Sequence, residues 1–145
     1  MAEARESIRE FFDAYAKATG SLDLAFLEAA YGDSFMFAYP GGVHAVKRDD
    51  FLKVVPKRGA FFRAAGLAGS EVSRVEEMRL DDNHTVVQTH WSLRFEKDPG
   101  RPIIEETAAT YVLRRQQGSW QIVFQLDHQD LTKRVQELGL LPPEG

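Results

Sequence analysis

The sequence has 145 residues, no cysteine and a formal net charge of -4 at pH 7. The lack of cysteine excludes disulfides, zinc-thiolate sites and thiol nucleophiles. The mildly acidic balance offers no broad electrostatic surface for nucleic acid, and no stretch is long and apolar enough to predict a membrane span. Charges interleave with the apolar residues at the N-terminus, unlike a signal peptide, so we expect a cytoplasmic protein.

A chain of this length buries about 70% of the surface that its unfolded form exposes, so it can build one sizeable core. We therefore expect a single domain over residues 1–145, with a tail from about residue 139. No repeat or low-complexity segment divides the chain.

The first part of the chain has the spacing of helices. Over residues 3–19 the apolar side chains recur every three or four positions, which is the pattern of a helix with one buried face. Gly20 can take the left-handed conformation that ends this helix, and Ser21 is a candidate N-cap for the next one. Helices are expected at residues 3–19, at residues 22–31 and from Asp49, with an interruption at Pro56.

The rest of the chain alternates in the manner of β-strands. A short strand over residues 34–39 precedes a Pro-Gly-Gly turn, and four longer strands follow a glycine-containing loop at residues 66–69. The longer strands are expected at residues 70–80, 85–96, 103–115 and 119–127, followed by a short helix at 131–138. Helices first and long strands afterwards predict an α+β fold, with the N-terminal helices packed on a curved antiparallel sheet.

The alternation also predicts which side chains face the helices. Trp91 belongs to the apolar side of its strand, and the last strand places Trp120 and Phe124 on its apolar side, with His128 next in phase. His90 lies with polar neighbours on the opposite side, and would face the helices only if the two faces were reversed. That polar face suits either solvent or a wet dimer interface.

This order of elements resembles the NTF2-like superfamily, a cone-shaped α+β fold that includes steroid delta-isomerase, scytalone dehydratase and the SnoaL-type polyketide cyclases. The resemblance covers nearly the whole chain. Its carriers are the stripe of the first helix, the Gly20-Ser21-Leu22-Asp23 corner, the strand ending Tyr39-Pro40-Gly41-Gly42 and the hairpin YVLRRQQGSWQIVFQLDHQDL. It implies a pocket between the helices and the concave sheet face, and often a homodimer formed through the sheet. It does not imply one chemistry, because the fold serves enzymes, binding proteins and transport factors.

The isomerase pattern does not carry over at its catalytic base. The family's aspartate stands just before a Pro-x-Gly turn, where this sequence has Tyr39, and a phenol is a poor base near neutral pH. The family's oxyanion-binding tyrosine on the first helix corresponds here to Asp13 rather than Tyr15. Steroid-type isomerisation is therefore not expected.

Aromatic side chains with few polar groups predict a pocket for a small apolar molecule. The ligand-binding residues are expected to be Tyr15, Phe37, Tyr39, Trp91, Tyr111, Trp120 and Phe124. The same residues at strand spacing are also typical of plain core.

His128, beside Asp127, is the candidate catalytic residue. If its imidazole points into the pocket mouth, a neighbouring carboxylate could orient it as a general base for isomerase, dehydratase or cyclase chemistry. Alternatively, residues 127–130 form the polar end of the strand, and Asp130 caps the last helix. Whether the protein is an enzyme stays open.

Neither a metal nor a cofactor is expected. The four histidines show no His-x-His or HExxH spacing, and the sequence has no Walker loop or GxGxxG motif. The basic run over residues 47–63 could attract an anionic partner or form a solvated helix face. A further alternative is an interaction module that works through the sheet face, with a possible homodimer.

Overall fold

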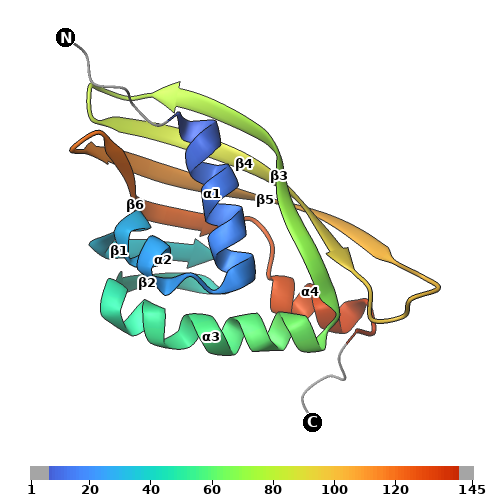
Figure 1. Cartoon of the computed structure of the whole chain (residues 1–145). Helices are drawn as coiled ribbons and strands as arrows, with labels where there is room; N and C mark the ends of the chain where they lie inside the picture. Colours follow the sequence, from blue (N-terminus) through green and yellow to red (C-terminus); the bar gives the residue numbers. More distant parts are fainter. Residues whose placement is uncertain (1–6, 141–145) are drawn as a thin grey trace.

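Three helices cover one face of a curved six-stranded sheet in the computed structural model, which describes residues 7–140 (Figure 1). The three covering helices are α1 (Ile8–Ser21), α2 (Leu24–Ala30) and α3 (Arg48–Ala64). A short fourth helix, α4 (Leu131–Glu137), follows the last strand. The strands are β1 (Tyr31–Tyr39), β2 (Gly42–Lys47), β3 (Leu67–Arg79), β4 (His84–Phe95), β5 (Ile103–Gln116) and β6 (Ser119–Asp127).

The strand order across the sheet is β2-β1-β6-β5-β4-β3. Neighbouring strands are antiparallel except β1 and β6, which run parallel. The α+β fold class is confirmed, and the expected antiparallel sheet is corrected to a mixed one. The reason is the long path between these two strands, because only a hairpin connection would force them to be antiparallel.

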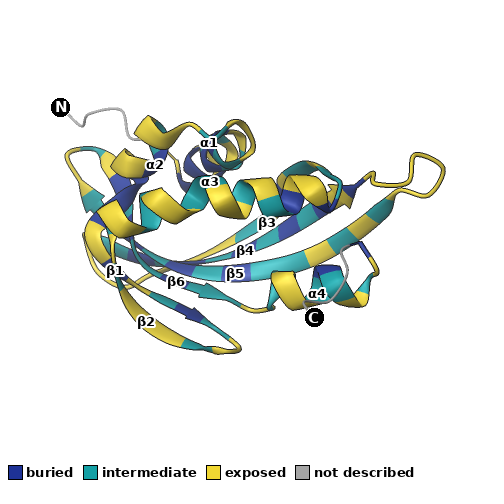
Figure 2. Ribbon diagram, turned by 90° about the horizontal axis from the view of Figure 1, so that it is seen from below, coloured by how far each residue is buried: buried dark blue, intermediate teal, exposed yellow. Residues whose placement is uncertain are grey.

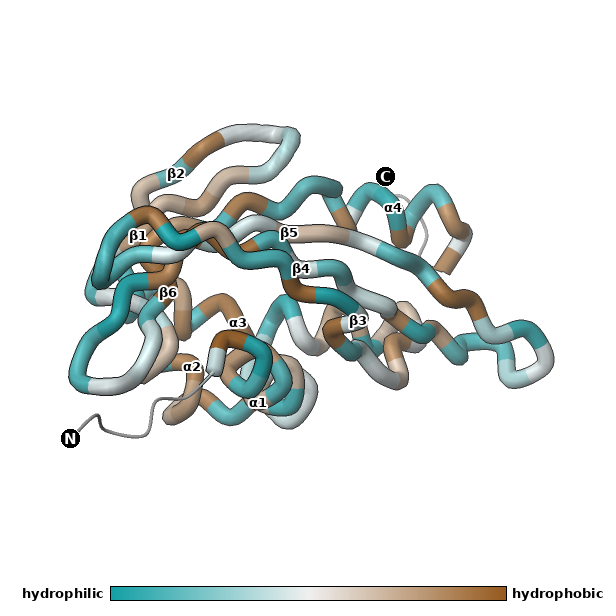
Figure 3. The backbone as a smooth tube through the Cα atoms, turned by 90° about the horizontal axis from the view of Figure 1, so that it is seen from above, coloured by the Kyte–Doolittle hydropathy of each residue, from teal (hydrophilic) through white to brown (hydrophobic). Residues whose placement is uncertain are grey.

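The core lies between the helices and the concave face of the sheet. Figure 2 shows α1, α2 and α3 on one side of the sheet, and Figure 3 shows the sheet curving around them with β2 and β3 at its edges. The rings of Phe12 and Tyr111 lie 4.8 Å apart, and those of Tyr15 and Trp91 lie 6.1 Å apart. The apolar stripe of α1 therefore packs on β4 and β5, as its periodicity predicts.

The connection between α1 and α2 lies two residues later than the sequence predicts. α1 continues to Ser21, and Leu22 takes the left-handed conformation (φ 57°) that was expected of Gly20. Asp23, rather than Ser21, caps α2, because its carboxylate accepts a hydrogen bond from the amide of Phe26 at 3.1 Å.

Two elements between residues 40 and 65 differ from expectation. The edge strand β2 was not predicted, because it is short and most of its side chains are exposed. α3 runs through Pro56 without interruption. Phe51, Val55 and Phe62 pack against the core from one face of this helix, and their burial holds it together across the proline.

An extra residue in β6 reverses the direction of its side chains. The register with β5 shifts between Ile122 and Phe124, which leaves Val123 as a β-bulge. Ile122 faces the helices before the bulge and Gln125 faces them after it, and both are buried. Phe124 and His128, which were expected on the inner side, therefore lie on the outer face of the sheet, so that part of the prediction is wrong.

The chain continues to pack beyond α4. Leu140 is buried in the core, although the tail was expected to begin at about residue 139. The rest of that tail, residues 141–145, and the expected start of the first helix at residues 3–6 lie outside the described residues. Over residues 7–140, no helix is long and apolar enough to cross a membrane.

Candidate functional site

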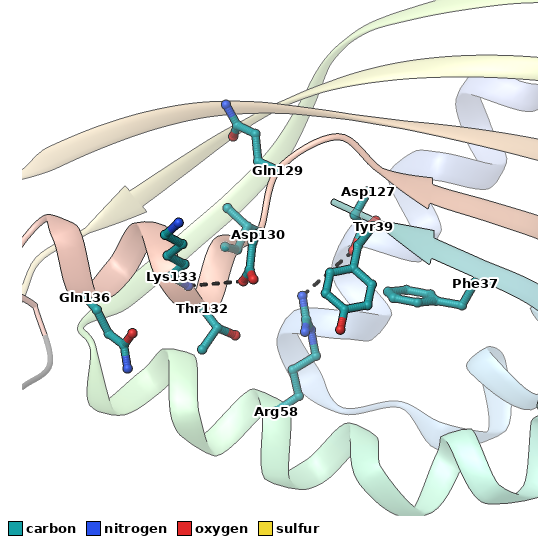
Figure 4. Close-up of a pocket in the computed structure, with 10 residues that line it drawn as sticks. Phe37, Tyr39, Arg58, Asp127, Gln129, Asp130, Thr132, Lys133 and Gln136 are labelled. Atoms are coloured by element: carbon teal, nitrogen blue, oxygen red, sulfur yellow. Dashed lines mark hydrogen bonds and ion pairs between the residues drawn. The ribbon is translucent and has the colours of Figure 1, made fainter. Parts of the chain in front are cut away.

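A cavity of about 420 Å³ opens between α3, α4 and the ends of β1 and β6 (Figure 4). Its lining combines two aromatic rings with charged and amide side chains, so it is more polar than the sequence predicts. The lining residues are Phe37, Tyr39, Arg58, Asp127, Gln129, Asp130, Leu131, Thr132, Lys133 and Gln136.

Asp127, the last residue of β6, supplies a mostly buried carboxyl group to this lining, with 17% of its side chain exposed. Gln125 Nε2 donates to Asp127 Oδ1 at 3.0 Å, and Arg58 Nη2 lies 3.9 Å from Oδ2. Burial raises the pKa of the Asp127 carboxyl group, whereas the hydrogen bond from Gln125 and the charge of Arg58 oppose that rise. A carboxyl group with a raised pKa in a cavity is a candidate for exchanging protons.

Behind Asp127, a chain of buried hydrogen bonds runs into the core. Tyr31 Oη donates to Gln125 Oε1 at 2.7 Å, and the hydroxyl groups of Tyr15 and Tyr31 lie 2.7 Å apart. Burial raises the pKa of all three core tyrosines, Tyr15, Tyr31 and Tyr111, so their hydroxyl groups stay neutral. The cavity is thus connected by polar contacts to the interior of the cone.

The aromatic wall of the cavity comes from the end of β1. The rings of Phe37 and Tyr39 lie 6.0 Å apart, and Tyr39 also stacks against His44 of β2 at 6.1 Å. A Cβ atom on Gly41 would come within 2.5 Å of the Tyr39 ring, so the glycine leaves room for this ring position. Figure 4 shows both rings beside Arg58 and Asp127.

The structure divides the expected ligand-binding residues into three groups. Phe37 and Tyr39 line the cavity. Phe124 lies on the outer face, where it pairs with Val112. The remaining four are buried in the hydrophobic core rather than in the cavity lining, and they are Tyr15, Trp91, Tyr111 and Trp120.

The two residues of the expected catalytic pair point to opposite faces of the sheet. Asp127 lines the cavity, whereas His128 is exposed on the outer face, where its Nε2 hydrogen-bonds Thr110 Oγ1 at 2.7 Å. The expected inward direction of His128 is wrong because the bulge shifts the phase of β6. His90 lies on the outer face, as expected, and contacts Glu76 Oε1 at 2.8 Å.

Asp130 caps α4, which confirms the capping role that the alternative gave to it. Its Oδ1 accepts a hydrogen bond from the amide of Lys133 at 3.1 Å. Because Asp130 also lines the cavity, the capping interaction fixes one wall of the site (Figure 4).

Gln125 and Arg58 were missed in the sequence. The alternation places Gln125 on the outer polar face, although its spacing of two from Asp127 indicates that both share one side of the strand. Arg58 belongs to the basic run of α3, and nothing in that run distinguishes it. Its contact with Asp127 spans 69 positions, which only the folded chain brings together.

Over residues 7–140, no group of three or more histidine, aspartate and glutamate side chains could hold a metal ion. The cavity offers its carboxyl groups to a ligand's hydrogen-bond donors instead. Its guanidinium group and side-chain amides can donate hydrogen bonds to a ligand's acceptors.

A family model described as NTF2-like protein (DUF6841) matches residues 3–130. No curated protein matches the chain. Many solved structures share its fold at low sequence identity, and three of them illustrate the likeness. An NTF-2 like protein of unknown function from Shewanella oneidensis MR-1 is 17% identical, with 83% of this chain and 95% of that chain covered and a TM-score of 0.66.

An NTF2-like protein with a cystatin-like fold from Novosphingobium aromaticivorans is 14% identical, with 88% of this chain and 85% of that chain covered and a TM-score of 0.69. The protein Aln2 from a Streptomyces species is 15% identical, with 88% of this chain and 91% of that chain covered and a TM-score of 0.68. At these identities the likeness concerns the fold, and the activity has to be inferred from the site itself.

Proposed function

The chain belongs to the family of NTF2-like proteins (DUF6841), and within that fold we propose that its cavity binds a small, largely apolar molecule with one hydrogen-bond donor. The observation that carries this proposal is the pairing of an aromatic wall with one partly buried carboxyl group. Phe37 and Tyr39 offer surface to a flat apolar body, and Asp127 offers an acceptor to a hydroxyl group.

The volume of the cavity supports a ligand of modest size. About 420 Å³ is at the lower end of the range of small-molecule sites, which runs from roughly 300 to 1,000 Å³. Two fused aromatic rings fit within that space. The ligand that we propose is therefore a small apolar molecule, as expected from the sequence, that carries one polar group.

The test compares 2-naphthol with naphthalene, which has the same rings and lacks the hydroxyl group. Binding is followed by amide chemical shifts in two-dimensional NMR. We expect 2-naphthol to shift the signals of Phe37, Tyr39 and Asp127 and to bind about tenfold more tightly, because a hydrogen bond to a charged acceptor is worth roughly 1.5 kcal/mol or more. Equal affinities, or shifts confined to the outer sheet face, would overturn the proposal.

A second candidate function is acid-base catalysis on a small hydrophobic substrate, with Asp127 in the role first expected of His128. The observation that favours it is the cavity-lining carboxyl group whose pKa is raised by burial. A general base of this kind would exchange a carbon-bound proton of a bound ketone with solvent. Incorporation of deuterium into 2-tetralone in D2O, faster with wild-type protein than with Asp127→Asn, would support catalysis, and equal rates would exclude it for this probe.

The outer face of the sheet supports a homodimer. One residue from each strand forms a continuous apolar row, because each is the register partner of the next. The row consists of Ala45, Met36, Phe124, Val112, Val86 and Met78. Unpartnered rows of this kind favour association with a second copy.

Met36 is the substitution that tests this dimer, because 40% of it is exposed in the single chain and it lies within the row. We expect sedimentation of the wild-type protein as a dimer and of Met36→Lys as a monomer. The matched control is Val54→Lys on the exposed side of α3, which should leave the dimer intact. A monomeric wild-type protein would remove this part of the proposal.

A further inference from the structure

The hydrogen bonds behind Asp127 have one direction. The hydroxyl hydrogen of Tyr31 is used toward Gln125 Oε1, so the hydrogen between the two tyrosines must come from Tyr15. Because its oxygen accepts from Tyr31, the amide group of Gln125 presents its Nε2 to Asp127 Oδ1. Each donor in the series Tyr15, Tyr31, Gln125 therefore points toward the carboxyl group.

This direction makes the two oxygens of Asp127 different. Oδ1 accepts the hydrogen bond from Gln125, which lowers its basicity, so this bond favours protonation at Oδ2. Oδ2 is the oxygen nearer Arg58, which also lines the cavity (Figure 4). The groups around Asp127 thus distinguish its two oxygens.

Charged and titratable groups from several elements lie around Asp127. α3 contributes Arg58, whose charge favours the ionised carboxyl group, and His128 contributes a weaker effect of the same sign from across β6. α1, β1 and β5 contribute the neutral hydroxyl groups of Tyr15, Tyr31 and Tyr111. The cavity adds two partly solvated charges, which are Asp130 and Lys133.

We propose that Gln125 and Tyr31 are positioning residues, which hold Asp127 so that Oδ2 alone exchanges a proton or a hydrogen bond with the ligand. Both side chains are buried, and the chain of contacts is continuous from Tyr31 to the carboxyl group. Cooperative polarisation along such a chain strengthens its last hydrogen bond. The proposal deepens the proposed function and rests on it for the presence of a ligand.

The experiment follows the carboxyl carbon of Asp127 by NMR in protein labelled with ¹³C-aspartate, titrated without any ligand. Gln125→Met removes the donor to Oδ1, and we expect the pKa of Asp127 to rise by about one pH unit. Tyr31→Phe removes only the hydroxyl group that orients Gln125, so we expect a smaller rise. Tyr15→Phe, one step further away, should give the smallest.

Thr89→Val is the matched control. Thr89 is a buried polar residue on the same inner face, and its hydroxyl group donates to Ala109 O at 2.9 Å, outside the chain to Asp127. We expect the pKa of Asp127 to be unchanged in this variant, even if its stability falls. An equal rise in Thr89→Val and Tyr31→Phe, or no rise in either Gln125→Met or Tyr31→Phe, would overturn the positioning role.

The same variants separate this proposal from the proposed function. A graded rise in the pKa of Asp127 without any binding of 2-naphthol would support the positioning role and contradict the ligand. Binding of 2-naphthol with an unchanged pKa in both Tyr31→Phe and Gln125→Met would support the ligand and contradict the positioning role. If Gln125→Met does not fold, Tyr31→Phe decides, because it removes a single oxygen atom.

Discussion

Before Val123, β6 turns Trp120 and Ile122 toward the helices; after it, the same strand turns Gln125 and Asp127 to that side. The first half builds the apolar core, and the second half delivers a carboxyl group to the cavity together with the buried amide that donates to it. One additional residue therefore changes a core strand into a strand that carries a site. The predictions below compare the two halves, from the largest expected effect to the smallest.

The core half should be far more sensitive to truncation. Ile122 is fully buried, so we expect Ile122→Ala to lower the free energy of unfolding by about 3 kcal/mol. Phe124 lies just beyond the bulge on the outer face, and we expect Phe124→Ala to cost about 1 kcal/mol. Urea denaturation at one protein concentration measures both. A larger loss for Phe124→Ala that does not depend on protein concentration would place its ring in the core rather than in the proposed dimer interface.

The site half should be sensitive to pH. Burial raises the pKa of Asp127 above its ordinary value of 3.8, so the unfolded chain releases this proton at lower pH than the folded one. Below pH 3.8 both the folded and the unfolded chain hold the proton, so the folded state loses no stability. As pH rises toward the folded pKa, the folded state loses about 1.4 kcal/mol for each pH unit between the two pKa values, and the loss persists above it.

Asp127→Asn removes this loss. We therefore expect the variant to gain stability relative to the wild-type protein between pH 4 and pH 8, as measured by urea denaturation at both values. His128→Gln is the neighbouring control and should show a much smaller change, because its side chain lies on the outer face and its effect on Asp127 is the weakest of those named. A gain of the wild-type protein over Asp127→Asn with rising pH has the opposite sign and contradicts the raised pKa.

Neighbouring residues should also differ in ligand binding. We expect Asp127→Asn to weaken binding of 2-naphthol about tenfold, because a neutral amide replaces the charged acceptor. His128→Gln should leave the affinity unchanged. Isothermal calorimetry at pH 8 measures both, and equal losses in the two variants would mean that the sheet face is assigned incorrectly.

The β1 side of the cavity should respond only weakly. A methyl group on Gly41 would displace the ring of Tyr39, so we expect Gly41→Ala to weaken 2-naphthol binding about threefold with little effect on stability. Gly69→Ala is the control, because a Cβ atom there meets nothing within 4 Å. If Gly41→Ala and Gly69→Ala bind 2-naphthol equally well, the position of the Tyr39 ring does not matter for binding.

The sequence predicts those parts of the fold that are encoded within one element. The stripe of α1 and the alternation of β4 are properties of short segments, and both match the structure. The edge strand β2 was missed because an exposed edge has no strong alternation. The continuous α3 was missed because the burial of its apolar face, a tertiary effect, outweighs the local preference of Pro56.

The site was less predictable than the fold. Val123 and Phe124 are both apolar, so the sequence continues to alternate plausibly in either phase, and the bulge is fixed only by the register with β5. Asp127 and Tyr39 were recognised as candidates. Gln125 was assigned to the outer face although it faces inward, and His128 was assigned to the inner face although it faces outward. A shift of one residue in register reverses every later side chain.

The most direct test of this account is the chemical accessibility of positions 125 and 128, since the natural chain contains no cysteine. Gln125→Cys and His128→Cys are each treated with a thiol-reactive disulfide reagent, first folded and then in urea. The account predicts rapid modification at 128 and modification at 125 slower on the order of a hundredfold, with equal rates in urea. Rapid modification at 125 with protection at 128 would mean that β6 has no bulge and that Asp127 does not face the cavity.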